Sequence, residues 1–139
     1  MTNMGQKTRF LLSSLLTLGI STFSGNVFSH HSFPATYIDG EKVTVEGDLA
    51  AFMFRNPHTY VHVNVKDDAG NVVRYAIEWG AAAALGRQGI DRSTLKPGDH
   101  VIITGLPARN AADHRVLLRT IERPADGFRW GFEEDETFK

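Results

Sequence analysis

The sequence predicts an all-β fold, a small five-stranded barrel with one helix between the third and fourth strands. Residues 59–65 carry the clearest strand pattern, because Thr59, Val61, Val63 and Val65 alternate with polar side chains and successive side chains of a strand face opposite sides. Turn residues separate further short segments of this kind, and one alanine-rich stretch supplies the helix.

The expected strands follow one another along most of the chain. The first is interrupted at Gly47, and a glycine inside a strand indicates a bulge or a sharp bend. A polar turn with Asp68 and Gly70 joins the second strand to the third, as in a hairpin. The five expected strands are residues 41–54, 59–65, 72–79, 100–106 and 114–123.

The only clear helix is expected at residues 81–88, because alanine is the best helix former and Gly89 can end the helix. A helix between the third and fourth of five strands is the layout of the OB-fold, a small, partly open Greek-key barrel. We therefore expect an OB-fold-like barrel over residues 41–123. Another small barrel or a sandwich is the alternative.

The N-terminus has the layout of a secretory signal peptide over residues 1–29. Lys7 and Arg9 precede an apolar stretch at residues 10–20, and the residues before His30 offer an acceptable cleavage site after Ser29. The apolar stretch is shorter than the ~20 residues that cross a bilayer, and no second one follows. We expect a periplasmic or secreted protein with no membrane span after cleavage. An uncleaved anchor or a buried helix is the alternative.

Two segments flank the expected barrel. Residues 30–40 form an N-terminal arm, in which Pro34 and the polar residues up to Gly40 favour an extended chain. Residues 124–139 form a C-terminal tail that ends in the acidic run 133–136, which we expect to be solvated.

Composition excludes several classes of function. The 139 residues include no cysteine, which excludes disulfides, thiolate metal sites and a cysteine nucleophile. The net charge of −1 falls to −3 when Lys7 and Arg9 are removed, and without a basic excess we expect no nucleic-acid partner. No hydrolase motif or phosphate-binding loop is present, so the sequence favours a non-enzymatic role.

Five short motifs, in their order and spacing, carry a family resemblance. They are residues 30–33 (HHSF), 56–60 (NPHTY), 85–89 (LGRQG), 95–99 (LKPGD) and 105–109 (GLPAR). With these motifs the chain resembles DUF6152, a family of small exported bacterial proteins of unknown function. The resemblance implies an exported small domain and no established activity.

Four histidines suggest a metal site, His30 with His31 and His58 with His62. Imidazole is the commonest protein ligand for metals and suits copper and zinc. Cleavage after Ser29 would give His30 a free amine, which with its ring could chelate copper in the manner of a histidine brace. The alternative is structural, with a polar start of the chain and two ordinary strand histidines.

The outer face of the expected sheet is a second candidate. Tyr60 shares this face with His58 and His62, beside Arg74 and Glu78 on the next strand, and many OB-folds bind ligands there. We therefore expect an exported binding or accessory protein that holds copper. The alternative is a metal-free module that binds an envelope protein or a small ligand through Tyr60, Arg74 and Glu78.

Overall fold

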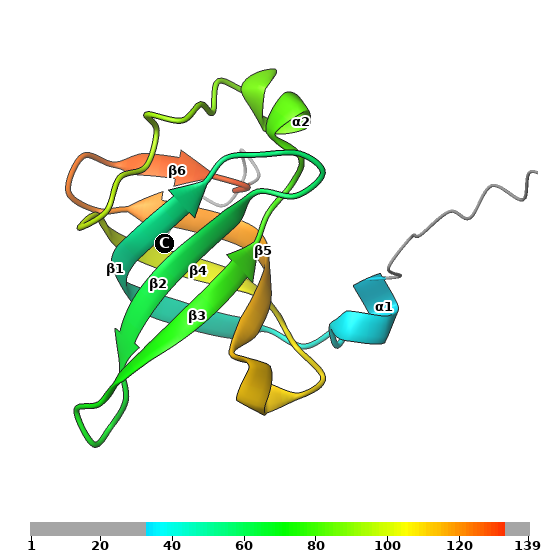
Figure 1. Ribbon diagram of the computed structural model, residues 1–139, viewed down its shortest axis with the longest axis vertical. Coiled ribbons are helices and arrows are strands. Elements are labelled where there is room, and N and C mark those ends of the chain that lie inside the picture. The colour runs from blue at the N-terminus through cyan, green and yellow to red at the C-terminus, as the bar shows by residue number, and fades with distance from the viewer. Residues whose placement is uncertain (1–32, 133–139) are drawn as a thin grey trace, which may run out of the picture. The chain divides into compact units, whose positions relative to one another are not determined.

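A closed five-stranded β-barrel forms the body of the protein (Figure 1). The computed structural model describes residues 33–132. The expected signal peptide, His30, His31 and the acidic run 133–136 lie outside this range. The elements in chain order are α1 (Phe33–Thr36), β1 (Val43–Met53), β2 (Tyr60–Lys66), β3 (Val72–Glu78), α2 (Ala82–Gly86), β4 (His100–Pro107), the 3-10 helix η1 (Ala111–Asp113), β5 (Arg115–Arg123) and β6 (Phe128–Trp130).

The strand pairings confirm the OB-fold. The sheet order is β3-β2-β1-β4-β5-β6, and a further pairing between β3 and β5 closes the first five strands into a barrel. This closing pair is parallel, whereas all the other strand pairs are antiparallel. Helix α2 lies between β3 and β4 in the chain, as the sequence predicts.

Strand β1 is long because it pairs with two strands, β4 and β2. Its first half pairs with β4 and its second half pairs with β2, with Asp48 common to both. The bulge expected at Gly47 lies instead at Ala50, where the register with β2 shifts. Gly47 is required for a different reason, since a Cβ there would collide with the backbone carbonyl of Asn64.

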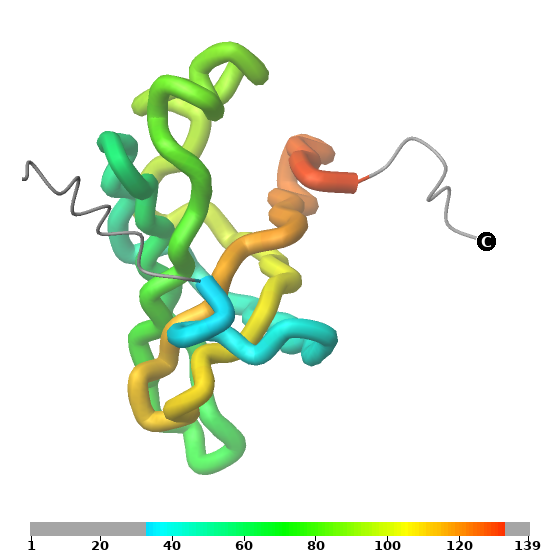
Figure 2. The backbone as a smooth tube through the Cα atoms, turned by 90° about the vertical axis from the view of Figure 1, so that its right-hand side faces the viewer, coloured from blue at the N-terminus to red at the C-terminus, as the bar shows by residue number. Residues whose placement is uncertain are grey.

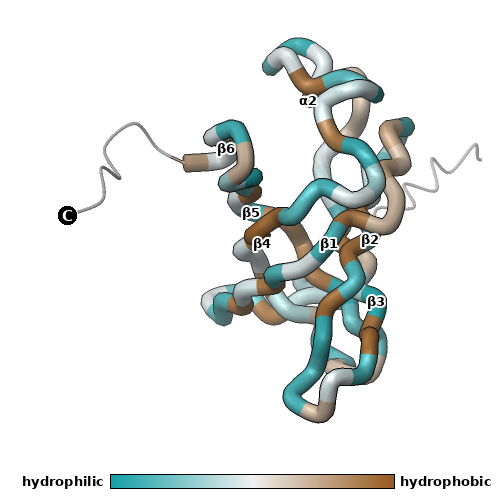
Figure 3. Tube along the Cα trace, turned by 90° about the vertical axis from the view of Figure 1, so that its left-hand side faces the viewer, coloured by the Kyte–Doolittle hydropathy of each residue, from teal (hydrophilic) through white to brown (hydrophobic). Residues whose placement is uncertain are grey.

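The interior of the barrel is filled by branched aliphatic side chains. The alternation in β2 is confirmed, because Thr59, Val61 and Val63 are fully buried, whereas Val65 at the end of the strand is only half-buried. Figure 3 shows the hydrophobic segments on the barrel strands and hydrophilic residues in the turn between β2 and β3. The buried cluster also includes Val45, Leu49, Ile77, Trp79, Leu85, Ile90, Leu95, Val101, Ile103, Val116, Leu118 and Ile121.

Two elements lie in segments where the sequence indicated no regular structure. Helix α1 makes one turn inside the expected arm, and Tyr37, directly after it, is buried and bridges to Ala108. Strand β6 lies inside the expected tail and pairs with β5 through Trp130 and Ile121. None of the helices in residues 33–132 has the length and apolar character needed to cross a bilayer.

Candidate functional site

Glu78, the last residue of β3, is the centre of a polar cluster. The sequence places it on an open outer face, but its exposed fraction is only 6%. Its Oε2 accepts hydrogen bonds from the Tyr37 hydroxyl at 2.5 Å and from Nη2 of Arg115 at 3.0 Å. Its Oε1 lies 3.1 Å from Nδ1 of His58. Both carboxylate oxygens are therefore occupied, which compensates the cost of burying the charge.

The barrel topology brings these four side chains together. Glu78 is paired across the sheet with Tyr60 of β2, and Arg115 begins β5, which runs parallel to β3. The backbone N–H of Thr59 donates to the carbonyl of Gly80, and this bond holds the segment that carries His58 beside the end of β3. Tyr37 reaches Glu78 from the segment after α1.

The Tyr37 hydroxyl is a donor in this cluster. Burial, and then the hydrogen bond to Glu78, raise the pKa of Tyr37 well above its usual value of about 10. Tyr37 is therefore protonated at neutral pH and stabilises the buried carboxylate of Glu78.

One ring nitrogen of His58 contacts Glu78, and the other has no hydrogen-bond partner among residues 33–132. Nδ1 faces Glu78, whereas no residue in the range 33–132 forms a hydrogen bond with Nε2. The side chain is 39% exposed. The ring of Phe33 lies edge-on to it, with 6.0 Å between the ring centroids. The first described residue of the chain therefore packs against His58.

His62 has a different environment. Its pKa is lowered by burial and then by the neighbouring charges of Arg74 and Arg55. The positive charges of these two arginines disfavour a further positive charge at the His62 ring. Within the part of the chain that the structure describes, no group of three or more His, Asp or Glu side chains is placed to hold a metal ion, so His58 and His62 do not make a metal site by themselves.

The outer face around Tyr60 is not an open platform. The guanidinium of Arg55 lies over the Tyr60 ring, 5.6 Å from its centroid. Nε of Arg74 donates to Oδ1 of Asn64 at 3.1 Å. With Glu78 buried, the three residues expected to form a ligand face are each engaged with neighbours of their own.

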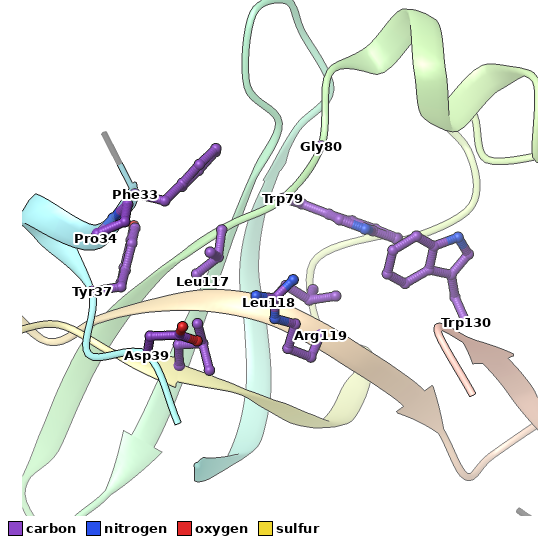
Figure 4. Close-up of a pocket in the computed structure, with 11 residues that line it drawn as sticks. Phe33, Pro34, Tyr37, Asp39, Trp79, Gly80, Leu117, Leu118, Arg119 and Trp130 are labelled. Atoms are coloured by element: carbon purple, nitrogen blue, oxygen red, sulfur yellow. The ribbon is translucent and has the colours of Figure 1, made fainter. Parts of the chain in front are cut away.

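Sequence reasoning missed a cavity on the outside of β5. Figure 2 shows β5 (orange) passing α1 (blue) on its way to β6 (red). The cavity has a volume of about 350 Å³ and extends from Phe33 and Tyr37 at one end to Trp130 at the other, with Trp79 and Arg119 between them (Figure 4). Both tryptophans of the chain line it. The two tryptophans were visible in the sequence, but they lie close together only because β6, which carries Trp130, pairs with β5.

Comparison with known proteins gives a family and a fold. Residues 19–117 match the model of DUF6152, described as a family of unknown function. Comparison with curated proteins gives no match. Among solved structures, the mitochondrial single-stranded DNA-binding protein Rim1 of S. cerevisiae is similar with a TM-score of 0.47 and 12% identity, over 63% of this chain and 96% of that one. A small single-stranded DNA-binding protein of Streptomyces coelicolor is similar with a TM-score of 0.39 and 13% identity, over 66% and 98%.

These likenesses correct one expectation. The net charge led us to exclude nucleic acid as a partner, and that exclusion is wrong, because both similar structures are single-stranded DNA-binding proteins. At 12% and 13% identity the likeness concerns the fold alone, and it assigns no ligand to this chain.

Proposed function

Since the chain belongs to DUF6152, a family of unknown function, we propose its role from its own residues. The protein is an exported accessory protein that binds one copper ion, with His58 as a ligand. The N-terminal histidines supply the remaining nitrogen ligands.

The pairing of His58 with Glu78 carries this proposal. A histidine that ligates a metal almost always directs its other ring N–H at a carboxylate or a carbonyl, which fixes the tautomer and the ring orientation. Nδ1 of His58 lies 3.1 Å from Oε1 of Glu78, so a proton on Nδ1 leaves the lone pair of Nε2 for a metal ion. Tyr37 and Arg115 hold the carboxylate in place.

Chain connectivity supports His31 as a second ligand. Phe33 packs against the His58 ring, and His31 precedes Phe33 by two residues. Two residues of chain span at most about 7 Å, so His31 is within reach of His58 by chain length. His30 and His31 lie outside the described residues, and their part in the proposal depends on the sequence.

Export belongs to the same proposal. The positive residues Lys7 and Arg9, the apolar stretch 10–20 and the cleavage site after Ser29 support transfer to the periplasm or the exterior. Cleavage at that bond would give His30 a free amine next to its ring. An amine and an imidazole on one residue form a chelate that suits copper.

The metal-free alternative has less support. An interaction module centred on Tyr60 requires Arg74 and Glu78 to be available to a partner. Arg74 is hydrogen-bonded to Asn64, and Glu78 is buried.

Copper titration of the exported protein tests the proposal. N-terminal sequencing gives its first residue, and calorimetry with copper(II) gives its affinity. We expect His58→Ala and His31→Ala each to weaken binding by at least about tenfold. His62→Ala is the matched control, since His62 is on the same face of the chain beside Arg55 and Arg74, and it should bind as the wild type does. Equal affinity in the wild type and in His58→Ala would contradict the proposed ligand, and an exported protein that retains residues 1–29 would contradict the cleavage.

A further inference from the structure

We propose that the cavity beside Trp79 binds a small apolar carboxylic acid, with the carboxylate paired to Arg119 and the apolar body between the aromatic walls. None of the proposed copper ligands lines this cavity, and the site requires no metal, although Phe33 also packs against His58.

The walls of the cavity select for an apolar body. Phe33, Trp79 and Trp130 contribute aromatic rings, and Leu106 and Leu117 contribute aliphatic side chains. Figure 4 shows Phe33 and Trp130 at opposite ends with Leu117 between them. A water molecule takes a share of about 30 Å³ in the liquid, so a volume of about 350 Å³ accommodates about ten to twelve non-hydrogen atoms. That is the size of a ring with a short side chain.

Arg119 lies at a β-bulge beside the cavity. Thr104 pairs with Thr120 and Gly105 pairs with Leu118, so Arg119 is the extra residue of β5. Bulges redirect a side chain and are common beside functional sites. Leu117 and Arg119 are two residues apart, so they share one face of β5, and both line the cavity together with Leu118.

The polar groups that line the cavity favour a ligand with hydrogen-bond acceptors. The side chain of Arg119 is exposed and forms no hydrogen bond or ion pair with any residue in the range 33–132. The carboxylate of Asp39, in contrast, accepts a hydrogen bond from the backbone N–H of Gly40. The unpaired guanidinium of Arg119 therefore favours a ligand that brings acceptor oxygens.

A carboxylate is the group that fits the Arg119 guanidinium. The planar guanidinium of arginine matches the two oxygens of a carboxylate in a bidentate pair. The carboxylate of Asp39, which also lines the cavity, disfavours a second negative charge on the ligand, so the ligand is a monoacid rather than a diacid.

Tryptophan fluorescence gives a direct measurement. Trp79 and Trp130 are the two tryptophans of the chain and both line the cavity, so any ligand that enters should change the emission. We would titrate the full-length exported protein with 3-phenylpropanoate and with 3-phenylpropanamide, which has the same shape without the charge. We expect saturable binding of the acid, at least about tenfold tighter than binding of the amide.

Three variants distinguish the contribution of the Arg119 charge to binding from that of the cavity volume. Arg119→Gln should reduce acid binding to the level of the amide, whereas Arg92→Gln, at another exposed arginine, should bind the acid as the wild type does. Leu117→Trp, which fills the cavity, should abolish binding of both compounds by calorimetry with an unchanged circular dichroism spectrum. Equal affinity for acid and amide, no saturable binding of the acid, or full binding by Leu117→Trp would each overturn the proposal.

Discussion

The hydroxyl of Tyr37 lies 2.5 Å from Oε2 of Glu78, and this contact ties the segment after α1 to the end of β3. It covers a carboxylate that would otherwise face solvent, and the same carboxylate orients His58. The segment after α1 and the candidate ligand His58 therefore both contact the same carboxylate.

Tyr37→Phe should destabilise the fold. The substitution removes a donor to a buried carboxylate, and hydrogen bonds to charged groups are worth about 1.5–3 kcal/mol. We expect a loss of that order in the free energy of unfolding, measured by urea denaturation. Tyr75→Phe is the control, since the hydroxyl of Tyr75 forms no hydrogen bond among residues 33–132. Equal losses in the two variants would show that the bond to Glu78 contributes nothing.

Gly47→Ala should also destabilise, for a steric reason. The new Cβ would collide with the backbone carbonyl of Asn64, and overpacking of this kind costs about 1–3 kcal/mol. Gly86 has no atom within 4 Å of the position of a Cβ, and Gly86→Ala should be neutral or add up to about 1 kcal/mol. The midpoints of urea denaturation of the two variants provide the comparison. A stable Gly47→Ala protein would contradict the close approach of β1 and β2.

His100 should make stability depend on pH. The hydrogen bonds that the His100 ring donates to Asp48 and then to Glu46 raise its pKa, so the folded state binds the proton more tightly than the unfolded state does. The stabilisation is fully present below the unfolded pKa of about 6.5 and is lost as pH rises through the higher folded pKa. Its size should stay below about 1 kcal/mol, because the ring is half-exposed. Urea denaturation between pH 5 and 9 should show a fall with rising pH that His100→Gln removes. An identical fall in that variant would rule out His100 as its source.

Arg74→Gln should raise the pKa of His62. Burial lowers that pKa most, and the charge of Arg74 lowers it next, so removal of the charge shifts the titration of the ring toward its usual value. NMR titration of the His62 ring protons measures the shift. The titration of His100 serves as an internal reference, and an unchanged pKa of His62 would refute the electrostatic explanation.

The alternating pattern explains why the fold was predictable. Valines at every second position of residues 59–65 define a buried face, and the position of the helix between the third and fourth strands restricts the topology. Val61 and Val63 are fully buried as a result. These features are local in sequence.

The environment of the site was less predictable because it depends on contacts between distant segments. Glu78 alternates correctly onto the outer side of β3, but it is buried because Tyr37, which is 41 residues away, covers it. The cavity depends on the pairing of β6 with β5, which brings Trp130 to it. Gly47 was identified as special from sequence, but the reason for it, the carbonyl of Asn64, belongs to another strand.

Copper-induced broadening of histidine ring signals in NMR spectra shows whether His58 is a copper ligand. Copper(II) is paramagnetic and broadens the signals of nuclei near it, so a substoichiometric amount added to the exported protein marks the ligands. We expect the ring signals of His58 to disappear first, while those of His62 and His100 persist. Loss of the His62 or His100 signals before those of His58, or uniform loss of all three, would contradict copper binding at His58.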